Sequence, residues 1–166
     1  MAKKTEILNK TQIENKISRL AYAVMEEIFE EKELVIIGIE PNGNHLAGKI
    51  SKIIKKELNI ETRILSMHIN KSDPWKSEPT AFEGKNSIEG KTILLVDDVL
   101  NSGKTMAYAL KIIMEHRVKK LKTLVLVDRD HKDFPIKADF VGLSLSTNLQ
   151  SHIQVDFNPP ENAYIK

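Results

Sequence analysis

The sequence predicts an α/β fold with a mainly parallel central sheet flanked by helices, in a single domain spanning residues 1–166. Short continuous apolar runs, typical of strands covered on both faces, recur along the chain. Stretches with apolar residues at helical spacing lie between these runs. Strands and helices that alternate in this way form parallel sheets through right-handed crossovers.

The first helix is expected over residues 11–31, where apolar residues recur at helical spacing and Thr11 with Glu14 makes a candidate capping box. Residues 34–39 read LVIIGI, which predicts a strand buried on both faces. Apolar residues recur again over 46–58 with lysines between them. This second pattern predicts a helix with a solvated face.

The second half of the alternation is equally regular. Residues 62–69 alternate between apolar and polar side chains, which favours a half-covered strand near a sheet edge. A strand at 92–97, a helix with Met106 and Ile113 on its apolar face, and a strand at 123–128 follow. The chain therefore contains repeated strand–helix–strand units.

Two segments break the alternation. Residues 70–90 are polar, contain two prolines and include the only tryptophan. A loop of about 20 residues in a compact domain is usually a flexible lid or binding loop, or else disordered, and we expect a lid. Residues 128–166 contain only short strand-like pieces, so we expect a small cap over one end of the sheet.

Composition excludes several classes of protein. The chain of 166 residues has no cysteine, which rules out disulfides, thiolate metal sites and cysteine nucleophiles. It has no apolar run of signal-peptide or membrane-span length, so we expect a soluble, cytoplasmic protein. With 25 basic and 23 acidic residues, the formal net charge is +2, too balanced for a dedicated polyanion binder.

The stretch TILLVDDVLNSGKTM places two aspartates at the carboxyl end of a buried strand, where open α/β sheets bind their ligands. The turn NSGKT opens a helix, so its amides and the helix dipole favour a phosphate monoester. Asp97 and Asp98 would repel such a ligand unless they face hydroxyl groups or a divalent cation. A ribose 5-phosphate supplies both a phosphate and a vicinal diol.

Two other interpretations compete with this one. The letters GKT also end the phosphate loop of P-loop nucleotidases, but that motif needs a glycine where Asp98 stands. The stretch GNHLAGKI, 43–50, has both glycines and the lysine but ends in Ile50, where a hydroxyl must bind magnesium. A purely structural turn is the remaining alternative.

The stretch LLVDDVLNSGKT closely resembles the 5-phosphoribosyl-1-diphosphate (PRPP) motif of type I phosphoribosyltransferases. Together with VIIGIEPNGNHLA and VLVDRDHKDFPIKADFVG, in this order and spacing, it resembles the PyrR family. Members of that family are bifunctional uracil phosphoribosyltransferases and pyrimidine-operon attenuators. The resemblance covers most of the chain except residues 70–90.

The resemblance implies a role for each matching residue. Asp97 and Asp98 would hold the ribose hydroxyls, and Arg129 would contact a carbonyl of the base with Val127 and His131 beside it. The expected lid, which the resemblance does not cover, offers Lys71 as the natural clamp for the pyrophosphate, with His68 and Trp75 as further lid candidates. Mg²⁺ would bridge substrate oxygens, with Asp97 as a candidate ligand and no site made by the protein alone. The PRPP-binding set is Pro41, Asn42, Gly43, Asp97, Asp98, Val99, Leu100, Asn101, Ser102, Gly103, Lys104 and Thr105.

The chain also departs from the family pattern. Pro41, Asn42 and Gly43 replace a threonine–arginine–glycine loop, which removes a cation and a hydroxyl. Asn101 stands where purine-salvage relatives have an aspartate, which favours uracil over a 6-oxopurine. A feeble catalyst that acts as an RNA-binding regulator is a further alternative.

RNA binding is disfavoured, although Arg19, His131 and Lys137 retain part of the basic surface that attenuators use. The first helix carries four glutamates, and Tyr22 and Pro41 replace a histidine and a threonine. We expect PRPP and a nucleobase as partners, and a homo-oligomer. The four glutamates are Glu26, Glu27, Glu30 and Glu31.

Overall fold

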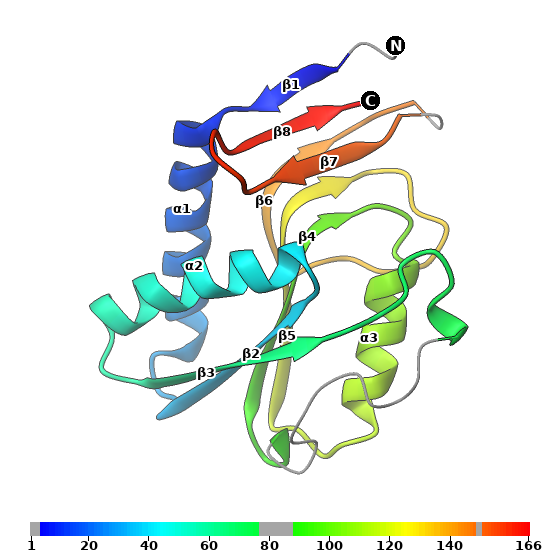
Figure 1. Ribbon diagram of the computed structural model, residues 1–166. Helices are drawn as coiled ribbons and strands as arrows, with labels where there is room; N and C mark the ends of the chain where they lie inside the picture. Colours follow the sequence, from blue (N-terminus) through cyan, green and yellow to red (C-terminus); the bar gives the residue numbers. More distant parts are fainter. Residues whose placement is uncertain (1–3, 77–87, 149–150) are drawn as a thin grey trace.

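The computed structural model describes residues 4–76, 88–148 and 151–166. Its centre is a five-stranded sheet in the order β3–β2–β4–β5–β6 (Figure 1). Every neighbouring pair in this sheet is parallel, which confirms the predicted fold class. The strands are β2 (Glu33–Ile39), β3 (Glu61–Met67), β4 (Thr92–Leu100), β5 (Lys120–Arg129) and β6 (Phe140–Leu145).

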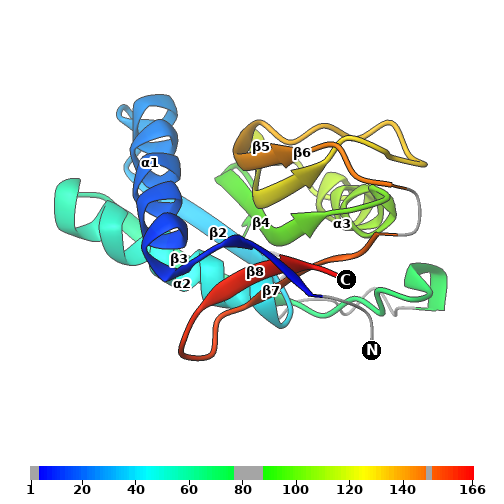
Figure 2. The same cartoon turned by 90° about the horizontal axis from the view of Figure 1, so that it is seen from above.

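Helices cover both faces of this sheet. Helices α1 (Lys10–Ile28) and α2 (Asn42–Glu57) lie on one face and α3 (Lys104–Met114) on the other (Figures 1 and 2). Successive strand residues point to opposite faces, so Leu94 joins the core under α1 and α2 while Leu95 joins the core under α3. Both faces are thus apolar, as the continuous apolar runs predict.

The start of α1 corrects the predicted capping box. Asn9, not Thr11, is the N-cap: its side chain accepts a hydrogen bond from the Gln12 amide at 2.9 Å. The Gln12 side chain accepts from the Asn9 amide at 2.9 Å, which completes the box. The pair Thr11 and Glu14 lies inside the helix, because the Asn9 box satisfies the end amides two residues earlier.

Helix α2 also begins earlier than predicted, at Asn42 rather than at Leu46. The turn between β2 and α2 is tight, since a Cβ on Gly38 would lie 2.4 Å from the Asn44 side chain and 2.7 Å from its Cα. The absence of a side chain at Gly38 therefore lets α2 start directly after the strand. Asn42 and Gly43 consequently belong to the first helical turn and not to a loop.

A second, smaller sheet lies at one end of the molecule (Figure 1). Its order is β1–β8–β7, with both pairings antiparallel, so the first and last strands of the chain lie side by side. Residues 128–166 divide between the two sheets, because β6 joins the main sheet. The strands are β1 (Thr5–Leu8), β7 (Ile153–Asp156) and β8 (Asn162–Ile165).

The 70–90 segment is described in part. Residues 70–76 leave β3 and end in a short 3₁₀ helix, Pro74–Lys76, next to α3. Residues 77–87, where most of the expected lid falls, lie outside the described residues. Within the described ranges, no helix has the length and apolar character needed to span a membrane.

Strand β4 sets the position of the site. Within the described chain, its pairing with β2 ends at Val96, whereas its pairing with β5 continues to Leu100. The last four residues of β4 therefore project past β2. Asp97 and Asp98 lie in this projecting part of the strand, rather than in a loop after it.

Candidate active site

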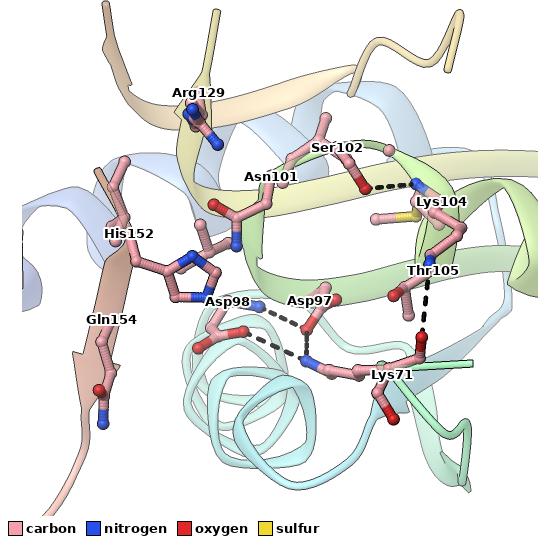
Figure 3. A pocket seen from close by; sticks show the side chains of 16 residues that line it. Lys71, Asp97, Asp98, Asn101, Ser102, Lys104, Thr105, Arg129, His152 and Gln154 are labelled. Atoms are coloured by element: carbon pink, nitrogen blue, oxygen red, sulfur yellow. Dashed lines mark hydrogen bonds and ion pairs between the residues drawn. The ribbon is translucent and has the colours of Figure 1, made fainter. Parts of the chain in front are cut away.

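A cavity of about 520 Å³ lies at the carboxyl ends of the strands (Figure 3). Five parts of the chain contribute to it: residues 71–72, the end of β4, the loop into α3 with its first turn, the end of β5, and β7 with the residue before it. Its walls are formed by Lys71, Ser72, Asp97, Asp98, Val99, Leu100, Asn101, Ser102, Gly103, Lys104, Thr105, Met106, Arg129, His152, Ile153 and Gln154.

Three charged side chains meet at the base of this cavity. Lys71 Nζ lies 2.9 Å from Asp97 Oδ1 and 3.6 Å from Asp98 Oδ1. Both aspartates are buried, at 3% and 7% exposure, so these charges are largely removed from water. Asp97 Oδ1 also accepts a hydrogen bond from the Asp98 amide at 2.9 Å, and Asp98 Oδ2 accepts one from Asn42 Nδ2 at 2.7 Å.

This crowding changes the proton affinities of two of the groups. Burial raises the pKa of Asp97 to about 8, and the Asp98 carboxylate adds to the rise while Lys71 opposes it. Burial alone would lower the pKa of Lys71, but attraction to Asp97 and Asp98 outweighs it and raises the pKa. The ligand-free site therefore keeps the lysine charged and readily protonates Asp97.

The loop before α3 forms a second wall. Gly103 is the N-cap in a left-handed conformation, φ 84°, and α3 starts at Lys104. The amides of its first turn have no partner within the helix and point toward the loop, with the Ser102 and Thr105 hydroxyls nearby. Such a helix start favours an anion.

The loop of residues 130–137 braces this wall from behind. Ser102 O accepts hydrogen bonds from the amides of Asp133 and Phe134, both at 3.0 Å. A Cβ on Gly103 would lie 3.2 Å from Phe134 O. The 130–137 loop thus holds the 101–105 turn in place from behind.

The third wall combines Arg129, Asn101 and His152 (Figure 3). The Arg129 guanidinium is held by Thr147 Oγ1, which accepts at 2.8 Å, and by Asn148 O, which accepts at 3.0 Å. Asn101 Oδ1 is buried without a hydrogen-bond partner among the described residues. A ligand with an N–H group would satisfy that oxygen.

Sequence reasoning missed His152, Ile153 and Gln154. They line the cavity because β7 pairs with β8 and lies beside the end of β4. The four-residue strand β7 has no motif, so only its place in the fold reveals it.

Five predicted site residues do not line the cavity. Val127 is fully buried in the core, and His131 is exposed on the 130–137 loop. The turn of Pro41, Asn42 and Gly43 lies behind the aspartates: Asn42 Nδ2 donates to Asp98 Oδ2 and, at 2.9 Å, to Val155 O. A Cβ on Gly43 would lie 2.5 Å from Val96 O, so this glycine allows close helix–strand contact.

The two further lid candidates lie outside the cavity wall. His68 Nδ1 is 3.3 Å from Glu40 Oε2 in an exposed pair. Trp75 is 66% exposed and packs at 6.4 Å, between ring centroids, from Phe134. Trp75 therefore contacts the 130–137 loop, which packs behind the 101–105 turn.

The side chains in the cavity also indicate how a metal ion could bind. Among residues 4–76, 88–148 and 151–166, no cluster of three or more histidine, cysteine or acidic side chains could hold a metal. The two neighbouring carboxylates, Asp97 and Asp98, fit a Mg²⁺ ion that takes most of its ligands from a substrate and from water.

The site combines paired buried carboxylates, a helix start that favours an anion, and a fixed arginine, all on a parallel sheet. This combination defines a nucleotide or sugar-phosphate enzyme. The chain matches the phosphoribosyl transferase domain family over residues 3–159, and it belongs to that family. Within the family it belongs with the PyrR-like type I members. It is 31% identical to Bifunctional protein PyrR of Haemophilus ducreyi, over 90% of this chain and 87% of the relative. It is 34% identical to that of a Geobacter species, over 95% and 93%.

Solved structures of phosphoribosyltransferases share the fold. A hypoxanthine-guanine phosphoribosyltransferase from Bacillus anthracis has a TM-score of 0.76 at 18% identity, covering 97% of both chains. The hypoxanthine phosphoribosyltransferase of Trypanosoma cruzi has a TM-score of 0.78 at 17% identity, covering 97% of this chain and 95% of its own. At these identities the likeness concerns the fold. The protein is thus a phosphoribosyltransferase by family and by architecture.

Proposed function

We propose that this phosphoribosyltransferase transfers the ribose 5-phosphate of PRPP to uracil and so forms UMP and pyrophosphate. The observation that carries the proposal is the one cavity in which Asp97 and Asp98 lie next to the 101–105 turn at the start of α3. Carboxylates hold a vicinal diol through charge-assisted hydrogen bonds, and a helix start holds a phosphate. A ribose 5-phosphate presents both groups.

The remaining part of the substrate is its pyrophosphate. Lys71 already lies in the cavity with a full positive charge, so it can exchange its carboxylate partners for pyrophosphate oxygens. The Asn42 side chain donates to Asp98 from behind and supports the same end of the site. Asp97 or Asp98 would help to hold a Mg²⁺ ion, which would supply positive charge to neutralise the leaving group.

The chemistry needs no nucleophile from the protein. The bond between the anomeric carbon and pyrophosphate breaks, pyrophosphate leaves with the bonding electron pair, and a ring nitrogen of the base bonds to the same carbon from the opposite face. The protein positions both reactants and excludes water that would hydrolyse PRPP. Positive charge that develops on the ribose lies near Asp97 and Asp98, which stabilise it.

Two features support a nucleobase with adjacent N–H and C=O groups. Arg129, fixed by Thr147 and Asn148, can donate to a base carbonyl, and the buried Asn101 Oδ1 can accept from an N–H. The resemblance to PyrR proteins favours uracil among such bases. A chain without cysteine suits the cytoplasm, where we place this reaction.

The test measures product formation from PRPP, in the presence of Mg²⁺, with uracil, hypoxanthine, guanine and xanthine assayed in parallel. We expect UMP and an equal amount of pyrophosphate with uracil, and little product with the purines. Nucleotide formation from hypoxanthine or guanine alone would contradict the choice of uracil but not the reaction class. No product with any base would leave the protein as a PRPP-binding regulator.

A further inference from the structure

Residues 70–76, here called the strap, connect β3 to the front of α3. The strap has a preformed turn: Asn70 Oδ1 accepts from the Ser72 amide at 3.1 Å, the Ser72 hydroxyl at 2.6 Å and the Asp73 amide at 3.3 Å. Its first residues line the cavity. The strap therefore has a defined conformation of its own, and contacts at its two ends can fix its position.

One end is held by Lys71, which forms ion pairs with Asp97 and Asp98. The other end is held by Trp75. The Trp75 ring packs on Phe134 at 6.4 Å, and Lys104 Nζ lies 5.5 Å from its centroid. Trp75 is 66% exposed, so burial alone does not account for its position.

Lys104 also joins the two ends. Its Nζ donates to Ser72 O at 3.4 Å, besides lying over Trp75. Lys104 is the first residue of α3 and lines the cavity next to the phosphate-binding turn. The strap is thus fastened by cations that a phosphorylated ligand would attract.

The contacts of Lys104 with the strap compete with its binding of a phosphate. A charge-assisted hydrogen bond to a phosphate oxygen is stronger than a contact with an exposed indole ring or a neutral carbonyl. A phosphate bound at the 101–105 turn therefore draws Lys104 away from Trp75 and Ser72. A ribose diol at Asp97 and Asp98 likewise displaces Lys71.

We propose that Trp75 is a positioning residue: it holds the strap, and with it Lys71, in the ligand-free arrangement, and its contact with Lys104 opens when the substrate phosphate binds. The proposal rests on the proposed function, because it takes PRPP as the ligand. Opening the contact uses part of the binding free energy, so the apparent affinity for PRPP is lower than that of an already open site. The contact of Trp75 with Phe134 does not involve Lys104 and continues to guide Lys71, so loss of the indole ring also slows the reaction.

Trp75 is the only tryptophan of the chain and reports on this step directly. Titration of the wild-type protein with PRPP and Mg²⁺ should change the Trp75 emission, because the ring loses the ammonium above it. Mg²⁺ alone should leave the emission unchanged.

Kinetics of substituted proteins separate positioning from structural support. W75L should lower the Kd for PRPP about two- to five-fold and lower kcat by a similar factor, the range expected from an exposed cation–π contact. W75F keeps an aromatic ring on Phe134 and should stay near wild type in both. F29L removes another exposed ring, 69% exposed and remote from the cavity, and should change neither.

The outcomes separate the two proposals. If calorimetry detects no PRPP binding to the wild type, both this inference and the proposed function are wrong. If PRPP binds but the Trp75 emission does not respond and W75L matches wild type, only the positioning role is wrong. If W75L weakens PRPP binding together with the melting temperature, Trp75 merely supports the fold and the proposal is overturned.

Discussion

Asp97, Asp98 and Lys71 bring two carboxyl groups and one ammonium group together away from water. Removing such groups from water is costly, and ion pairing repays the cost only where hydrogen bonds satisfy the remaining lone pairs. Asn42 and the Asp98 amide supply such bonds here. Such a cluster destabilises the free protein. Groups with strongly shifted pKa values of this kind are typical of functional sites, where a ligand relieves the crowding.

Asp98→Asn should preserve the fold but reduce transfer at least about 100-fold, because hydrogen bonds to a charged group contribute about 1.5–3 kcal/mol each. Melting temperature and product formation are measured on the same preparation. Asp130→Asn, which changes an exposed aspartate outside the cavity, is the matched control and should behave as wild type. Turnover near wild type in Asp98→Asn would rule out this carboxylate as a substrate ligand.

Asp97→Asn should make stability less dependent on pH. The folded-state pKa of about 8 lies above the ordinary value of 3.8, so the folded protein holds a proton that the unfolded chain releases. Stability from this group is fully present below pH 4 and is lost as pH rises to about 8.

The measurement is the melting temperature of ligand-free protein at pH 5 and pH 8. Between these values the wild type should lose more stability than Asp97→Asn, and each ~1 kcal/mol displaces the midpoint by about 2–4 °C in a domain of this size. Parallel pH profiles of the two proteins would show that Asp97 ionises normally.

At the scale of elements, β4, the 101–105 turn and α3 form the part of the fold that the sequence predicts best. A continuous apolar strand, two aspartates and a small polar turn are local signals, and the structure places them in one cavity wall. Helices α1 and α2 start earlier than apolar spacing predicts. Capping by Asn9 and the close approach of Asn44 to Gly38 decide those boundaries, and neither appears in apolar spacing.

Gly103→Ala should destabilise the protein by about 1–2 kcal/mol, because φ 84° suits glycine but not a residue with a Cβ. The added atom would also press on Phe134 O, so the turn must shift and PRPP binding should weaken. Gly48→Ala is the control: it lies within α2 with open space around it and should stabilise by about 0.5–1 kcal/mol. Thermal melting and PRPP calorimetry test both; an unchanged PRPP affinity in Gly103→Ala would contradict the phosphate-binding role.

At the scale of the whole molecule, the main sheet follows from the sequence and the small sheet does not. Strand β1 pairs with β8, at the other end of the chain, with Thr5 opposite Ile165. Four-residue strands whose partners lie so far away carry no periodic signal of their own. For the same reason His152 and Gln154 could be found in the cavity wall only from the fold.

The surface charge of the molecule bears on RNA. Arg19 Nη2 donates to Gly142 O at 2.6 Å, so part of the expected basic surface is engaged within the protein. Glu31 pairs with Lys119 at 2.8 Å and Glu27 lies 3.8 Å from Lys122, whereas Glu26 and Glu30 form no ion pair with any residue the structure describes. Those two exposed carboxylates oppose phosphates.

We therefore predict no specific binding of a leader-RNA hairpin. A gel shift with the leader RNA of the protein's own pyrimidine operon, with UMP or GMP present, measures this. The double variant Glu26→Gln/Glu30→Gln serves as a comparison. It should increase only weak, salt-sensitive binding of RNA. Submicromolar binding by the wild type that weakens when UMP is replaced by GMP would show that the acidic residues do not exclude RNA.

The central claim is that Asp97, Asp98 and the 101–105 turn bind PRPP as a ribose phosphate. Calorimetric titration with PRPP and with ATP, each with Mg²⁺, tests it most directly in wild type and Asp98→Asn. We predict saturable binding of PRPP to the wild type, binding weaker by at least about ten-fold in Asp98→Asn, and no comparable binding of ATP. Preference for ATP over PRPP, or equal PRPP affinity in the two proteins, would contradict it.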